Sequence, residues 1–199
     1  SNFIAGVNAG NSIVSGGTRN VLIGDEAGTA ITTGDYNVAL GYAALDAEDA
    51  GSRATALGYF ALSSQNTDTD SYNVAVGFSA GESVTTATRS VLIGGLAGDA
   101  LDTGTRNVVI GYNALGIDTK GNKAVAIGYG ALQTQNLTSD TDTFNVGVGY
   151  NALGSNTTGI NNVAIGSLAL DANTTAANNT AVGSAALGAN TTGADNVAV

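Results

Sequence analysis

The chain has 199 residues, of which 16 are acidic and six are basic, and its net charge is −10 at pH 7. This charge disfavours nucleic acid and anionic membrane surfaces as partners, and no apolar run reaches the ~18 residues of a membrane-spanning helix. His, Cys, Met and Trp are all absent, which removes the commonest general base, thiol nucleophile, zinc ligands and disulfides. The composition therefore favours a protein that is not an enzyme and holds no cofactor.

One motif recurs along the whole chain, and a regular copy reads Asn-Val-Ala-Ile-Gly-Ser-Leu-Ala-Leu at residues 162–170. We number positions from the motif glycine, which is position 0. The motif glycines are 17 to 21 residues apart, and they are Gly6, Gly24, Gly41, Gly58, Gly77, Gly94, Gly111, Gly128, Gly149, Gly166 and Gly183. A short fixed period indicates a solenoid in which each repeat is one coil stacked on its neighbours. We expect residues 1–199 to form a single array of about eleven coils, with the glycines as structural turns. Because both ends fall within a copy, we interpret the array as an excerpt of a longer fibre.

The residues before each motif glycine are expected to form a short parallel strand. Positions −3 and −1 are mostly Val, Ile or Leu, whereas position −2 is mostly Ala. Since successive side chains of a strand point to opposite faces, we expect the large residues to fill the coil and the small ones to face another backbone.

A second apolar stripe is expected from the −2 alanines and from the leucines at position +4, such as Leu115 and Leu132. A thin coil without disulfides can bury such a stripe only against a partner, and identical chains usually do so by forming a closed, symmetric oligomer. We predict a parallel homotrimer, although the geometry also allows a dimer.

Two repeats are longer than the rest, those before Gly77 and Gly149, and their extra residues are expected to project as loops. Carboxylates in these loops are weak candidates for Ca²⁺ ligands, although solvated loop tips explain the same pattern; they are Asp68, Asp70, Asp140 and Asp142. Residues 18–24 resemble residues 88–94, which indicates a four-coil superrepeat of about 70 residues. A plainer shaft is expected after about residue 154.

Two ladders of side chains follow the coils. Position −5 carries basic and aromatic residues: Arg19, Tyr36, Arg53, Tyr72, Arg89, Arg106, Lys123 and Phe144. Position +1 is aromatic in six coils: Tyr42, Tyr59, Phe78, Tyr112, Tyr129 and Tyr150. In register, members of the −5 ladder are one coil apart and close enough for cation–π stacking. Two interpretations stay open: the ladders are packing rungs between coils or chains, or they form a strip that stacks on sugar rings.

Two polar ladders accompany them. Asparagine occupies position −4 in eight copies, from Asn20 to Asn196, and is predicted to form a side-chain ladder or to bond neighbouring backbone. Threonine occupies position −8 in eight copies, from Thr33 to Thr192. A flat threonine rank can template ice, so an ice-binding solenoid is a remote alternative.

The motif Asn-Val-Ala-Ile-Gly-x-x-Ala at fixed spacing resembles the head repeats of trimeric autotransporter adhesins (YadA-like). The longer period, with Asn-Thr-Thr-Gly at residues 156–159 and 190–193, is similar to repeats of bacteriophage tail fibres. The resemblance covers all 199 residues and implies a left-handed parallel β-roll assembled as a homotrimer. The 17-residue period and the two longer repeats depart from the adhesin-head pattern, and the chaperone segment of related fibres is not seen in these residues.

The function implied is that of a non-enzymatic fibre segment, the shaft of a receptor-binding phage tail fibre or a related trimeric extracellular fibre. Such a shaft, on a virion tail or a cell surface, presents a tip to a host cell. A cell-surface glycan or protein receptor would then be bound through parts outside this segment. The alternative is the head of a bacterial surface adhesin that binds glycan or matrix directly.

Overall fold

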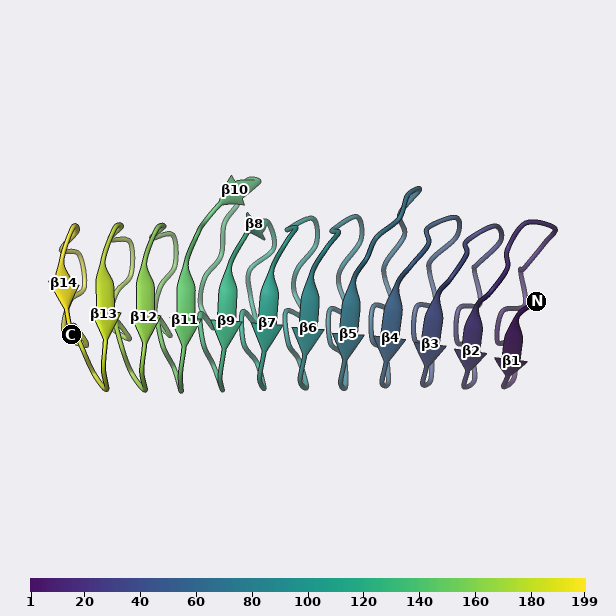
Figure 1. Cartoon of the computed structure of the whole chain (residues 1–199), viewed down its shortest axis with the longest axis horizontal. Coiled ribbons are helices and arrows are strands. Elements are labelled where there is room, and N and C mark those ends of the chain that lie inside the picture. The colour runs from purple at the N-terminus through teal and green to yellow at the C-terminus, as the bar shows by residue number, and fades with distance from the viewer.

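The computed structural model describes residues 1–199 and shows a row of stacked coils made of short strands and turns, without helices (Figure 1). None of its segments is a helix with the length and hydropathy needed to span a membrane. The strands are β1 (Phe3–Ala5), β2 (Val21–Ile23), β3 (Val38–Leu40), β4 (Thr55–Leu57), β5 (Val74–Val76), β6 (Val91–Ile93), β7 (Val108–Ile110), β8 (Gly121–Asn122), β9 (Val125–Ile127), β10 (Thr141–Asp142), β11 (Val146–Val148), β12 (Val163–Ile165), β13 (Thr180–Val182) and β14 (Val197–Ala198). The prediction of an all-β parallel solenoid is confirmed.

Twelve strands, all except β8 and β10, form one parallel sheet in chain order. Each residue pairs with the residue at the same motif position in the next coil, as Val91 does with Val108. This register continues across the longer repeats, where Val125 pairs with Val146. The coils are therefore aligned at the motif glycines, as the spacing predicted. The sheet has one strand more than the number of motif glycines because β14 lies in a copy without its glycine.

The interior of the coil is filled by the face of the strand opposite to the one predicted. The −2 side chains, such as Leu92, Ala126 and Ala164, are completely buried. The −1 residues Leu40 and Ile165 are instead 47% and 42% exposed. The assignment of large residues to the interior was wrong, because the opposite wall of the coil supplies most of the interior volume.

That volume comes from positions +3 and +4. The +4 leucines, Leu115 and Leu132 among them, are fully buried in the hydrophobic core. They cannot belong to a free apolar stripe, so the second stripe predicted from −2 alanines and +4 leucines does not exist. The stripe left without a partner is formed by positions −3 and −1 on the outer face of the sheet.

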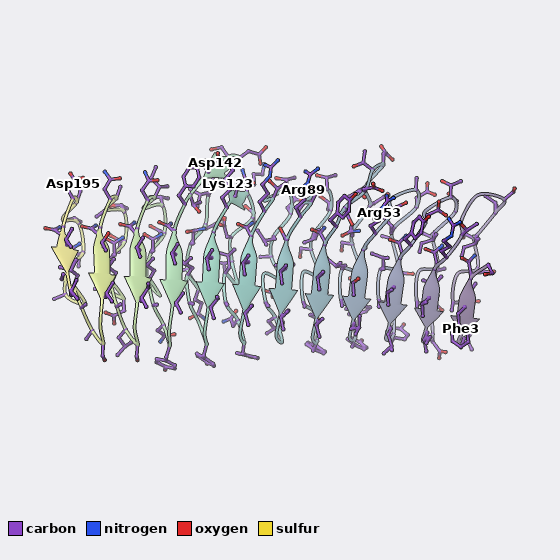
Figure 2. The ribbon with its side chains drawn as sticks, viewed as in Figure 1. Phe3, Arg53, Arg89, Lys123, Asp142 and Asp195 are labelled. Atoms are coloured by element: carbon purple, nitrogen blue, oxygen red, sulfur yellow. The ribbon has the colours of Figure 1, made fainter.

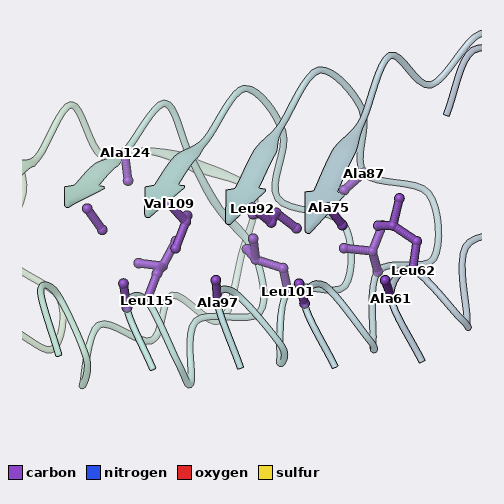
Figure 3. Close-up of a cluster of buried hydrophobic side chains, with 14 of the residues drawn as sticks. Ala61, Leu62, Ala75, Ala87, Leu92, Ala97, Leu101, Val109, Leu115 and Ala124 are labelled. Carbon is purple, nitrogen blue, oxygen red and sulfur yellow. The ribbon is translucent and has the colours of Figure 1, made fainter. Parts of the chain in front are cut away.

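Position +7 completes the core, and Figure 3 shows one such residue, Leu101, in the same cluster as Leu62 and Leu92. The residue types at +4 and +7 compensate for each other. Where +4 is leucine, +7 is polar, and it is buried in every coil but the last, as in Leu62 with Gln65. Where +4 is glycine, +7 is a large apolar residue that uses the vacant space. A Cβ added to Gly28 would lie 2.8 Å from Ile31 Cδ1. Each coil thus holds one large apolar side chain at either +4 or +7.

The motif glycines are required by close stacking. Gly111 has a φ of +134°, and a Cβ there would lie 2.4 Å from the carbonyl oxygen of Gly128 in the next coil. No side chain fits that gap, so this turn can approach the backbone of the next coil only because it is glycine.

Candidate functional site: the outer face of the sheet

The outer face of the sheet gathers most of the exposed large hydrophobic side chains. Positions −5, −3, −1 and +1 all contribute to this face, whereas −4 and −2 point inward. In Figure 2, which looks onto the strands, Arg53, Arg89 and Lys123 lie beyond the beginnings of the strands. The +1 residues follow the motif glycine at the other end of each strand. An aliphatic centre is therefore bordered by the −5 ladder on one side and the +1 ladder on the other.

The −5 ladder forms the predicted cation–π contacts in four pairs. The Arg19 guanidinium carbon lies 5.1 Å from the centroid of the Tyr36 ring. Arg53 lies between Tyr36 and Tyr72, at 5.2 and 5.8 Å from their centroids. Lys123 Nζ lies 5.0 Å from the Phe144 centroid. These contacts join consecutive coils along one edge of the solenoid.

Arg89 and Arg106 occupy the middle of this ladder and have neither an ion pair nor a stacked ring within the chain. Each −5 residue in the ladder also adopts left-handed backbone, with a φ of 60° at Arg106. This turn carries the chain into the strand. Two adjacent, exposed and unpaired arginines are unusual in a chain with a net charge of −10.

The long loops supply acidic partners to the −5 ladder. Asp70 pairs with Arg53 and raises the pKa of the guanidinium by a hydrogen bond. Asp142 Oδ2 lies 2.5 Å from Lys123 Nζ. Outside the long loops, Asp35 accepts hydrogen bonds from the backbone N–H and hydroxyl of Thr18, which lower the pKa of Asp35.

The aspartates proposed as weak Ca²⁺ candidates lie in or next to these loops. Asp70 and Asp142 make the ion pairs just described, and Asp140 Oδ1 accepts a hydrogen bond of 3.0 Å from Thr103 Oγ1. Asp68 is exposed. The structure brings together no group of three acidic residues that could hold a metal ion.

The +1 ladder consists of two stacks of three rings. The centroids of Tyr42 and Tyr59, and of Tyr59 and Phe78, are 5.4 Å apart. The second stack, Tyr112, Tyr129 and Tyr150, has centroid distances of 5.6 and 5.5 Å. Gly95 occupies +1 between the stacks and interrupts them. All six residues remain between 45% and 58% exposed, so part of each side chain is free to contact another molecule.

The −4 asparagines form the predicted ladder inside the coil. Asn37 Oδ1 accepts from the Ala54 N–H at 2.9 Å in the next coil, while Asn37 Nδ2 donates to the Gly51 carbonyl at 2.9 Å. The same pair of bonds recurs at Asn107, Asn145 and Asn162. Each buried amide is thus satisfied by backbone, which gives it a structural role.

Sequence reasoning missed the buried polar residues at +7. Glu48 accepts from the N–H of Gly51, the N–H of Thr67 and the side chain of Gln65. Burial raises the pKa of Glu48 above its ordinary value. The signal that could have revealed these residues is the coupling between +4 and +7 within each repeat.

No pocket is present on the chain, so the features able to contact another molecule are the two ladders and the aliphatic stripe between them. Comparison with protein-family models, curated proteins and solved structures gives no match. The class of protein that the structure itself defines is a parallel β-solenoid with one coil per sequence repeat.

Proposed function

We propose that this chain is a structural segment of an extracellular fibre, the shaft of a receptor-binding phage tail fibre or of a related trimeric fibre. In this role it sets the reach of the fibre and presents a tip to a host cell surface. The observation that carries the proposal is an uninterrupted stack of in-register coils with an exposed apolar stripe along its length.

The exposed stripe supports assembly. Leu40, Ile93 and Ile165 at position −1 are 36% to 47% exposed, and their neighbours at −3 are only partly buried. An extended apolar surface of this kind usually marks an interface between proteins. We propose that it is covered by two further copies, in a parallel homotrimer of left-handed coils.

The oligomeric state tests this assembly directly. Analytical ultracentrifugation of the chain should show a trimer, and electron microscopy should show straight rods. Leu40→Asp combined with Ile93→Asp should yield monomers, because both charges would lie within the interface. The control is Ile117→Asp, since Ile117 is 47% exposed but lies at position +6, outside the stripe. A stable, folded monomer at micromolar concentration would contradict the proposal.

A second candidate function is direct binding of glycan by the head of a bacterial trimeric adhesin, in which this segment itself contacts the receptor. The half-exposed, stacked rings of the +1 ladder favour it, since aromatic faces pack well against the apolar faces of sugars. Binding of the fragment to a glycan array, lost in Tyr112→Ala with Tyr129→Ala while the circular dichroism spectrum is unchanged, would support this function. Absence of binding would favour the shaft.

A further inference from the structure

We infer that the −5 and +1 ladders are the two complementary halves of one interface between copies of this chain. In this arrangement the −5 residue of one chain packs on the +1 residue at the same level of its neighbour. The inference rests on the fibre assembly proposed above and adds which side chains meet in it.

Within one chain the two ladders are kept apart. The −5 and +1 residues of a coil are separated by the whole strand, a distance of roughly 20 Å at about 3.3 Å per residue. All cation–π contacts of the −5 ladder lie within that ladder, and the +1 rings stack only on one another and on Phe60. The outer half of each ring is therefore available to another chain.

The two ladders nevertheless match each other level by level. In six coils a cation or an aromatic ring at −5 shares its level with a ring at +1: Tyr36 with Tyr42, Arg53 with Tyr59, Tyr72 with Phe78, Arg106 with Tyr112, Lys123 with Tyr129, and Phe144 with Tyr150. Both ladders become polar together, at the levels of Asn161 with Ser167 and Asn178 with Ser184. Arg19 shares its level with the opposite charge of Asp25. Only Arg89, opposite Gly95, meets no side chain.

Positions that never touch within a chain have no intrachain reason to change character at the same levels. Contact between chains supplies that reason. It also provides ring partners for Arg106, which has none in its own chain, and cation–π attraction strengthens when the pair is shielded from water.

The geometry agrees with a closed ring of chains. An interface between two different edges is heterologous, and it closes into a ring when the rotation between copies permits. With −5 of one chain on +1 of the next, the aliphatic stripe between the two edges turns toward the symmetry axis. The same arrangement therefore buries the stripe and both ladders at once.

Disulfide trapping tests the pairing cleanly because the chain has no cysteine. Arg106→Cys with Tyr112→Cys, and Asn178→Cys with Ser184→Cys, place two thiols at one level but on opposite edges. A disulfide requires α-carbons within about 7 Å, so a bond in either variant must join different chains. On non-reducing gels most of each variant should run as a covalent trimer. The displaced pair Arg106→Cys with Tyr129→Cys should link several-fold less, and the single-cysteine variants should remain unlinked.

The outcomes separate this inference from the proposed function. A chain that sediments as a trimer while both level-matched variants stay unlinked would overturn the pairing and leave the fibre standing. Dimers formed by a single-cysteine variant would overturn it in favour of a two-fold contact between identical edges. A monomer that is retained on a glycan array through Tyr112 and Tyr129 would overturn both the pairing and the shaft. Covalent trimers from both level-matched pairs would establish it.

Discussion

Gln65 donates a hydrogen bond of 2.7 Å to the buried carboxylate of Glu48 in the coil before it. Gln65 Oε1 in turn accepts from Asn73 Nδ2, and Asn73 Oδ1 accepts from the backbone N–H of Ser90. The same relay runs from Asp118 through Gln135 and Asn145 to Asn162. Each relay lies at one of the two longer repeats, where Thr67 or Leu137 also donates its N–H to the carboxylate. The relays therefore anchor the chain where it leaves the regular coil.

Glu48→Gln should lower the stability although it removes a buried charge. The backbone donor at Ser90 orients both amides, so Gln65 presents its NH₂ group to position 48 and needs an acceptor there. The NH₂ group of a glutamine at position 48 would face either the NH₂ group of Gln65 or the backbone N–H groups that the carboxylate now accepts. Either way a buried donor loses its acceptor, which costs about 1–3 kcal/mol. The melting temperature at a fixed scan rate measures the loss. An unchanged melting temperature would show that the relay does not contribute.

The pH dependence of stability offers a second measurement on Glu48. Burial raises its pKa in the folded chain above the ordinary value of 4.5. Between the pKa of Glu48 in the unfolded chain and its higher pKa in the folded chain, the folded state binds more protons than the unfolded state. The stability of the folded chain therefore falls as the pH rises through this interval. Glu48→Gln should flatten that slope relative to the unmodified chain in melts recorded from pH 4.5 to pH 7. Parallel curves would contradict the assignment.

Alanine at a motif glycine should be far more damaging inside the stack than at a level without a following glycine turn. Gly111 and Gly183 have almost the same φ, +134° and +132°, so both substitutions carry similar backbone strain, on the order of 1–3 kcal/mol. Only at Gly111 would the Cβ also meet a carbonyl oxygen at 2.4 Å, while at Gly183 its nearest neighbour is Ala186 Cβ at 3.9 Å. Thermal melts of Gly111→Ala and Gly183→Ala should differ clearly. Equal effects would indicate that strain alone requires glycine.

Leu115 and Ile117 lie only two residues apart, but one belongs to the core and the other to the surface. Leu115 is fully buried and Ile117 is 47% exposed. Leu115→Ala should cost about 2–5 kcal/mol through lost burial and a cavity, whereas Ile117→Ala should stay within about 0.5 kcal/mol. Denaturant unfolding of the two variants checks the difference. A mild effect at Leu115 would contradict its place in the core.

Removal of residues 139–142 should leave the coil intact. The deletion removes β10, its short pairing with β8 and the exposed ion pair of Asp142 with Lys123. An exposed pair is worth about 0.2–1 kcal/mol, so the melting temperature should fall only slightly.

Deletion of the equally long segment 136–139 is the matched control. It removes Leu137, which is 7% exposed and whose N–H bonds to Asp118. This variant should be clearly less stable than the other. If the deletion of 139–142 is the one that prevents folding, the loop belongs to the core.

The register of the sheet could be predicted because the same steric constraint recurs in each repeat. A glycine with no room for a side chain recurs at each level, so the spacing of the glycines is the spacing of the coils. The asparagine ladder followed from the same repetition, since an amide can serve both its own coil and the next. The stacking of the −5 residues was predictable for the same reason.

The choice of inward face was not predictable from alternation. Alternation defines two faces but does not say which one is inside, and the larger residues at −3 and −1 favoured the wrong face. Asn37 and Asn107 are instead completely buried, and the side-chain nitrogen and oxygen of each are hydrogen-bonded to backbone. The pairs Arg53–Asp70 and Lys123–Asp142 were also out of reach, because they depend on the course of two irregular loops.

The coils exchange backbone hydrogen bonds and packing with the coils directly above and below them. The length of the rod is therefore a whole number of equal steps, each of about 4.8 Å. A duplication of 17 residues lengthens the rod by one step and continues the backbone hydrogen bonds between coils. The length of the array can thus be changed by adding or removing whole repeats, without changing the backbone interactions between coils.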